Sequence, residues 1–177
     1  MGDQTSRRYL YVAIDRASRW VYLAIKPHKT AAAARPFLNS LHKACPIRTS
    51  HILTDNGKEF TDRLFGCRAR QAMAGHVLEL LCQALGVEHR LSQPRTPRIN
   101  GMVERFNGRI ADILKTHHFR SGEELETALM RYAWLCNHHL PQKALGHIAP
   151  VQALKQWQDS LPHLFIKLGA NQPGHER

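Results

Sequence analysis

Residues 51–57 have the sequence HILTDNG, and this stretch decides which fold the chain can adopt. Its first four residues are predicted to form a short buried strand, and the Asn56-Gly57 pair that follows is a turn signal. Asp55 therefore lies just beyond the C-terminal end of a strand, which is where open α/β sheets place their ligands. The stretch predicts an α/β fold with a carboxylate at a ligand-binding edge.

A second acidic motif lies at residues 100–107, with the sequence NGMVERFN. Asn100 is a suitable N-cap for a helix that is predicted to run to about Lys115, with Glu104 on its first turn. Residues 92–99 are rich in Pro and Arg and are predicted to form an exposed loop. Two carboxylates in a cationic setting indicate a divalent metal and a phosphodiester substrate. Glu104 does not belong to the apolar stripe of this helix. The stripe consists of Val103, Phe106, Ile110, Ile113 and Leu114.

Two strands are predicted before the first motif, at residues 9–14 and 20–25, and the short link between them indicates a hairpin. Thr30 is a candidate cap for a helix that runs to residue 44. Pro36 either kinks this helix or is its first helical residue. Residues 62–75 have little pattern and form a basic insertion.

The rest of the chain is predicted to be mostly helical. A helix at residues 76–85 ends at Gly86, and residues 87–91 are predicted to form the last strand. A capping box at Ser121 opens a helix to about residue 138. A short helix from residue 150 to 157 precedes an irregular tail. This order of elements is typical of a mixed α/β protein.

The helix at residues 121–138 has more apolar surface than one buried face requires. Leu125, Leu129, Tyr132, Ala133 and Cys136 make that buried face. The extra apolar residues indicate a subunit contact, and they are Met130, Trp134 and Leu135.

The chain is strongly basic, with 25 Lys and Arg against 14 Asp and Glu, a net charge of +11. Such a charge favours polyanionic partners. No apolar run reaches the length that a membrane span needs, and residues 1–8 lack the apolar core of a signal peptide. Nucleic acid is therefore the expected partner, and a membrane is not.

The four cysteines are far apart and form no Cys-x-x-Cys pair, so we expect buried free thiols in a reducing cytosol. The spacing of the 12 histidines matches no tetrahedral zinc site, so they are expected to lie on the surface or to face DNA.

These motifs together resemble the integrase catalytic core (DDE type) of bacterial insertion-sequence transposases, in the retroviral-integrase-like superfamily. The resemblance rests on segments 11–19 (YVAIDRASR), 53–60 (LTDNGKEF), 88–91 (EHRL) and 100–107, with Pro97, Tyr132, Asn137 and Pro141. It implies a ribonuclease-H-like mixed sheet flanked by helices. Residues 1–158 would form the catalytic core and residues 159–177 an irregular tail.

The resemblance also implies a chemistry. Such enzymes hold two divalent ions, Mg²⁺ or Mn²⁺, with an Asp, a second Asp and a Glu, and they cleave and transfer DNA strands. Asp55 matches the second aspartate and Glu104 the glutamate, separated by 104 − 55 = 49 positions. The expected partners are transposon ends, target DNA and further copies of the chain, in the bacterial cytoplasm at the nucleoid. The candidate DNA contacts are Arg95, Arg98, Arg105, Asn107, Arg109 and Lys115.

The first aspartate of the family has no clear counterpart. It normally lies on a central strand upstream of residues 9–15, where only residues 1–8 stand here. We therefore expect an N-terminally truncated chain that lacks this strand. Asp15 is the alternative third carboxylate, although an Asx-type turn bond would be sufficient reason for it. The alternative function is a catalytically inactive fragment that retains DNA or subunit binding.

Overall fold

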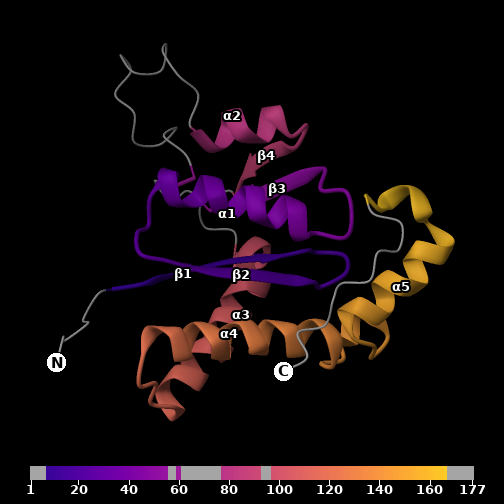
Figure 1. Ribbon diagram of the computed structural model, residues 1–177. Coiled ribbons are helices and arrows are strands. Elements are labelled where there is room, and N and C mark those ends of the chain that lie inside the picture. Colours follow the sequence, from indigo (N-terminus) through magenta and orange to yellow (C-terminus); the bar gives the residue numbers. More distant parts are fainter. Residues whose placement is uncertain (1–6, 56–58, 61–76, 93–96, 167–177) are drawn as a thin grey trace, which may run out of the picture.

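The computed structural model describes residues 7–55, 59–60, 77–92 and 97–166, with side chains omitted for 97–100 (Figure 1). Strands β1 (Tyr9–Ile14) and β2 (Val21–Lys26) form an antiparallel hairpin. Strands β3 (His51–Thr54) and β4 (Glu88–Leu91) pair in parallel. Among the described strands no ladder joins the two pairs, so the mixed sheet is interrupted between its antiparallel and parallel parts.

Helices cover both faces of the β1–β2 hairpin (Figure 1). Helices α1 (Ala31–Ala44) and α2 (Val77–Ala84) share one hydrophobic core with Tyr11. Helices α3 (Pro97–Thr116) and α4 (Gly122–His138) share a second core with Leu23. This division follows from the strand geometry, because successive side chains of β1 and β2 point to opposite faces.

The predicted hairpin and α1 are confirmed. Both the backbone N–H and the hydroxyl of Ser18 donate to the Asp15 carboxylate at 2.6 Å, which fixes the turn between β1 and β2. The Thr30 hydroxyl accepts from the Ala33 N–H, so α1 begins at Ala31. Pro36 therefore lies inside the helix and is not its first residue.

The start of α3 differs from the prediction. Residues 97–99 were expected in a loop with Asn100 as the cap, but the helix begins at Pro97. Proline suits a first helical position because its φ is already helical and that position needs no N–H donor. Glu104 consequently lies about two turns into the helix and not on its first turn. A favourable interaction with the helix N-terminus therefore does not explain it.

Helix α4 is held at both ends. Ser121 caps it by accepting from the Glu124 N–H, as the capping box predicted. Near its C-terminus, the buried Asn137 side chain accepts a hydrogen bond from the Val21 N–H at 2.7 Å. It also donates one to the Val21 carbonyl oxygen at 2.8 Å.

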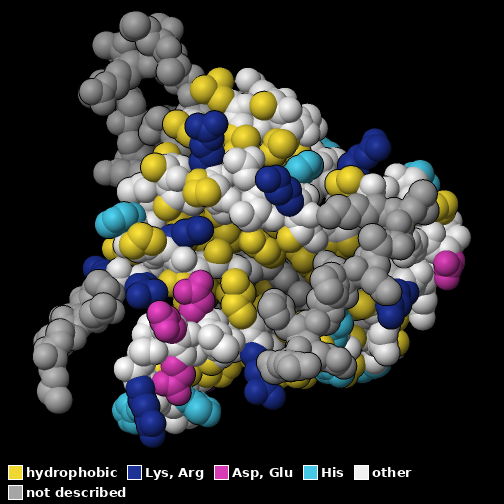
Figure 2. Space-filling model, in the orientation of Figure 1, with side chains coloured by type: hydrophobic (Ala, Val, Ile, Leu, Met, Phe, Trp, Pro, Cys, Tyr) yellow, Lys and Arg dark blue, Asp and Glu magenta, His cyan; other side chains and the backbone are white. Residues whose placement is uncertain are grey.

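The face of the molecule that Figure 2 shows carries few acidic side chains, and most of these gather where α4 begins.

The C-terminal part packs more regularly than predicted. Helix α5 (Pro150–Ser160) runs three residues beyond the expected end at Trp157, and a 3-10 turn, η2 (Pro162–Leu164), follows. Phe165 then forms an isolated bridge with Ile47. The basic insertion at 62–75 and the tail from residue 167 lie outside the described residues.

Three cysteines confirm the expectation of buried free thiols: Cys45, Cys82 and Cys136. Burial raises the pKa of each of these thiols. Cys67 lies outside the described residues. None of the described helices is both long and apolar enough to cross a bilayer.

Candidate nucleic-acid interface and acidic residues

Asp55 is exposed and directly follows β3, as predicted. Glu59 and Phe60, the next described residues, are tied to the core. Glu59 is only 5% exposed, and its carboxylate pairs with the Lys29 ammonium at 3.0 Å. The hydrogen bond to Glu59 raises the pKa of Lys29, and the charge of Asp55 adds to the same effect. Sequence patterns did not identify the Lys29–Glu59 pair, because its two residues are far apart in the sequence.

Glu104 is exposed on α3. It lies on the side of the helix opposite to Phe106 and Ile110, which are buried against the β1–β2 hairpin. Gly108 and Lys115 are also exposed and share its side of the helix.

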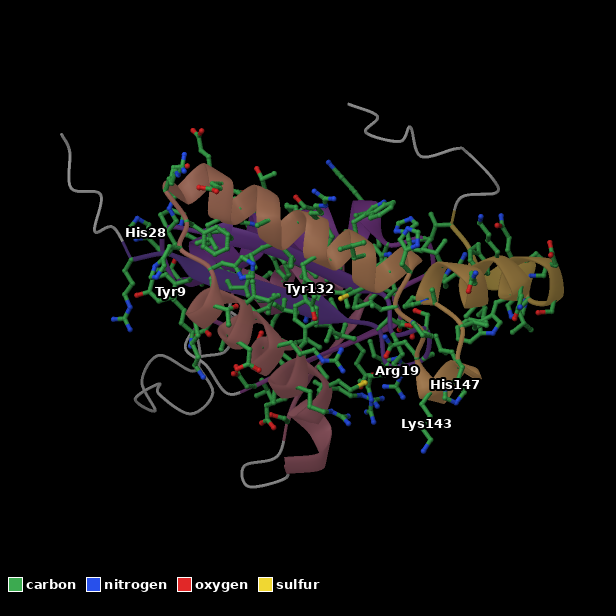
Figure 3. The ribbon with its side chains drawn as sticks, turned by 90° about the horizontal axis from the view of Figure 1, so that it is seen from below. Tyr9, Arg19, His28, Tyr132, Lys143 and His147 are labelled. Atoms are coloured by element: carbon green, nitrogen blue, oxygen red, sulfur yellow. The ribbon has the colours of Figure 1, made fainter. Side chains whose placement is uncertain are left out.

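The two acidic motifs have different described neighbours along the β1–β2 hairpin, one beyond its open end and the other in its turn. Asp55 is near Lys29, just beyond the C-terminal end of β2. Glu104 is two residues from Met102, whose sulfur contacts the Arg19 guanidinium in the turn. Figure 3 shows these two ends, with His28 at one and Arg19 at the other.

Asp15 belongs to the turn end of the hairpin. One oxygen of its carboxylate already accepts two hydrogen bonds from Ser18. This is the Asx-type turn bond that the sequence offered as a sufficient reason for the residue.

The carboxylates are suitable ligands for a divalent cation, but among the described residues they do not form a complete metal site. Carboxylate oxygens suit Mg²⁺ and Mn²⁺. Within the described ranges, however, no three His, Cys, Asp or Glu side chains come together to hold an ion.

A basic cavity of about 590 Å³ lies at the turn end of the hairpin, between α3, the end of α4 and the loop after it. Four cationic residues line it: Arg19, Arg105, Arg109 and Lys143. Ile14, Val21 and Phe106 also line it and give it apolar surface. Figure 3 shows Arg19 and Lys143 at this same end of the molecule. A second cavity, of about 550 Å³, shares Arg109 and Lys143 with the first.

The structure brings together only part of the predicted DNA-binding set. Arg105 and Arg109 line the cavity, while Lys115 is exposed and pairs with Asp112 at 3.6 Å. Asn107 is exposed on α3. Arg95 and the side chain of Arg98 lie outside the description.

Arg19 and Lys143 were missed by sequence analysis. They join the cavity only because α3 packs across the hairpin turn and the chain returns after α4. In the structure Arg19 has a φ of 63°, which is unusual for a residue other than glycine and which the sequence does not indicate.

The surroundings hold Arg109 in place. Its guanidinium interacts with the side chains of Tyr132 and Cys136 on α4. Burial is the main cause of the raised pKa of the Tyr132 hydroxyl. Several guanidinium and ammonium groups around apolar surface form a suitable site for a phosphodiester, because Arg binds phosphate oxygens through paired N–H donors.

Comparisons with known proteins identify similar sequences and structures. A family described as integrase core domain matches residues 1–97, and a second family with the same description matches residues 85–150. An uncharacterized 39.2 kDa protein of insertion element IS476 from Xanthomonas euvesicatoria is 31% identical over 102 residues, covering 57% of this chain and 26% of that protein. A retrovirus-related Pol polyprotein from transposon TNT 1-94 of Nicotiana tabacum is 27% identical, covering 95% of this chain and 14% of that protein. The chain thus spans only a minor part of the length of both relatives.

Solved structures support the fold. The catalytic core domain of BIV integrase superposes with a TM-score of 0.60 at 21% identity, covering 85% of this chain and 88% of that one. A chain of the simian T-cell lymphotropic virus intasome, in complex with a PP2A regulatory subunit, superposes with a TM-score of 0.63 at 21% identity. That match covers 98% of this chain and 55% of the other. The predicted ribonuclease-H-like fold is confirmed.

Proposed function

Because the chain belongs to the integrase core domain family, we propose that it is a DNA transposase or integrase core that binds DNA and takes part in metal-dependent strand cleavage and strand transfer. The relatives agree with this role, since one is encoded by an insertion element and the other by a transposon.

One observation carries the proposal. Four cationic side chains line the basic cavity, which lies beside α3, the helix that also bears Glu104. Arg105 and Arg109 are one turn apart on α3, so both can contact neighbouring phosphates of one strand. Arg19 and Lys143 extend the same basic surface from two other segments. A phosphodiester strand held here would pass along α3 near the exposed carboxylate.

Asp55 and Glu104 are the proposed metal ligands. When bound, divalent ions would activate the attacking hydroxyl group and stabilise the leaving oxygen of the phosphodiester. The part that the chain itself performs is to bind the DNA backbone and to present two hard oxygen donors. Assembly with further copies is also proposed, because the similar simian T-cell lymphotropic virus chain is part of an intasome.

The experiment follows nicking of supercoiled plasmid DNA in Mg²⁺ or Mn²⁺, together with direct Mn²⁺ binding measured by electron paramagnetic resonance. We expect nicking by the unmodified chain and its loss to background in Asp55→Asn and Glu104→Gln, with weaker Mn²⁺ binding in both. Asp112→Asn is the matched control, because Asp112 is an exposed carboxylate on the same helix, and it should retain both properties.

The outcomes separate the two parts of the proposal. Nicking that survives Glu104→Gln would contradict the metal-ligand assignment. DNA binding without Mn²⁺ binding or nicking would leave a DNA-binding core and refute its strand chemistry.

A further inference from the structure

An ion pair at the open end of the β1–β2 hairpin lies outside the basic cavity. The Lys29 ammonium is 3.0 Å from Oε1 of Glu59. Only 6% of the Glu59 side chain is exposed, compared with 54% of the Lys29 side chain. The carboxylate is therefore enclosed by the protein, while the lysine that pairs with it is open to solvent.

The residues around this ion pair hold both of its members in place. Tyr11 on β1 is 5% exposed, and its hydroxyl lies 3.4 Å from the carbonyl oxygens of His28 and Thr30, on either side of Lys29. Its ring packs edge-on against Phe60, with the ring centroids 6.3 Å apart. One buried side chain thus contacts both segments that carry the ion pair. Figure 3 shows His28 at this end of the molecule.

Asp55 lies near this lysine. The hydrogen bond to Glu59 is the main cause of the raised pKa of Lys29, and the negative charge of Asp55 contributes to the same shift. Because the interaction between two charges weakens with distance and is screened by water, this contribution indicates that the two side chains are neighbours. Lys29 is therefore a cation beside a proposed metal ligand, in a segment that neither acidic motif includes.

The ion pair is better suited to fixing a positive charge than to strengthening the fold. Enclosing a carboxylate costs desolvation free energy, and a well-packed apolar pair can join two segments equally well. An ion pair with a half-exposed lysine adds little stability. An ammonium group has three N–H donors, and one bond to a carboxylate uses only one of them. A lysine held in this way can bind a further anion through its other donors.

We propose that Lys29 binds a phosphate of the DNA strand that approaches Asp55, and that Glu59 positions the ammonium for this contact. The inference rests on the proposed function and adds to it a contact outside the basic cavity. A phosphate that met Asp55 alone would be repelled by a charge of the same sign, and a fixed cation beside the carboxylate offsets this repulsion. Lysine is suited to this contact because its ammonium binds phosphate as a compact charge.

The salt dependence of DNA binding tests the contact, by fluorescence anisotropy with a short duplex. A contact at Lys29 adds to those at the cavity, and each neutralised phosphate contributes about 0.9 to the slope of log affinity against log salt. Lys29→Met should therefore weaken binding several-fold and make the slope shallower by about 1, whereas Lys29→Arg should keep the slope. Glu59→Gln breaks the same ion pair but retains the cation, so it should also keep the slope. Lys43→Met is the matched control, because Lys43 is an exposed lysine at the far end of α1, and it should change the slope little.

The outcomes separate this proposal from the one on which it rests. A loss of slope in Arg105→Ala but not in Lys29→Met would refute the Lys29 contact and leave the proposed function standing. An equal loss in Lys29→Met and Glu59→Gln would show that the ion pair only holds the fold, and an equal loss in Lys43→Met would show that only net charge matters. Either of these results overturns the proposal. A chain that binds no DNA would refute both proposals.

Lysine acetylation followed by mass spectrometry tests the same contact without a substitution at Lys29. In the unmodified chain, duplex DNA should reduce acetylation of Lys29 several-fold and leave that of Lys43 unchanged. Without DNA, Lys29 should be acetylated faster in Glu59→Gln than in the unmodified chain, because its ammonium is no longer held by the buried carboxylate. Unchanged acetylation of Lys29 when DNA binds would overturn the contact, and an equal rate in Glu59→Gln would overturn the positioning role of Glu59.

Discussion

At the scale of one residue, Arg19 combines an unfavourable backbone conformation with a side chain that lines the basic cavity. Its φ of 63° lies in the left-handed region, where a side chain other than glycine costs about 1–2 kcal/mol. The turn keeps an arginine there, and its guanidinium reaches Met102 and lines the basic cavity. Strain of this kind is often retained where a side chain serves a binding site.

Replacing Arg19 with glycine should therefore have opposite effects on stability and on binding. We expect Arg19→Gly to raise the free energy of unfolding by about 1 kcal/mol, because glycine adopts this φ without strain. DNA binding, followed by fluorescence anisotropy, should weaken several-fold. Arg16→Gly is the control, since Arg16 is exposed in the same turn without a positive φ, and urea denaturation should show no gain for it. A less stable Arg19→Gly would mean that its contact with Met102 outweighs the strain.

At the scale of elements, the docking of α4 depends on one amide. The Asn137 side chain accepts from the N–H of Val21 and donates to its carbonyl, and both residues are buried. An amide is the side chain that can satisfy a donor and an acceptor of one residue at once. It therefore joins the C-terminal end of α4 to the start of β2, next to the basic cavity.

Asn137→Ala should be strongly destabilising. Because it would leave a buried N–H and a buried C=O of Val21 without partners, we expect a loss of about 2–4 kcal/mol in the free energy of unfolding. Urea denaturation monitored by circular dichroism measures it. Asn107→Ala makes the same chemical change at an exposed position of α3 and should lie within about 0.5 kcal/mol of the unmodified chain. Equal effects of the two substitutions would refute a special role for Asn137.

At the scale of the whole molecule, charge determines how the proposed DNA binding should depend on salt. The chain carries a net charge of +11, and four of its cations lie around one cavity. Binding that neutralises phosphates releases counterions, so affinity falls linearly with salt on logarithmic axes.

The salt dependence of DNA binding should report these contacts. If four phosphates are neutralised on duplex DNA, the slope of log affinity against log salt should be about −3.6. Arg105→Ala and Arg109→Ala should each make the slope shallower by about 1, in anisotropy titrations at several salt concentrations. Arg35→Ala, an exposed arginine on α1 across the sheet, should change it little. Should Arg35→Ala reduce the slope equally, the basic surface would be diffuse and not centred on the cavity.

Local patterns predicted most of the elements. The hairpin turn at Asp15, the Thr30 and Ser121 caps and the end of α2 at Gly86 follow from short-range chemistry, so they could be found without coordinates. The start of α3 differs from the prediction because Pro97 suits the first turn of a helix as well as a loop. Asp55 and Glu104 were found through their motifs, and their joint role remains a prediction.

The amino-acid sequence by itself determined the order of strands and helices, the two acidic motifs and the basic character of the chain. Only the tertiary structure decided that Arg19 and Lys143 join Arg105 and Arg109 around one cavity. The reason is physical. Caps, turns and periodicity act over a few neighbouring residues, whereas the contact between Arg19 and Met102 spans 83 positions and depends on how a whole helix packs across a sheet.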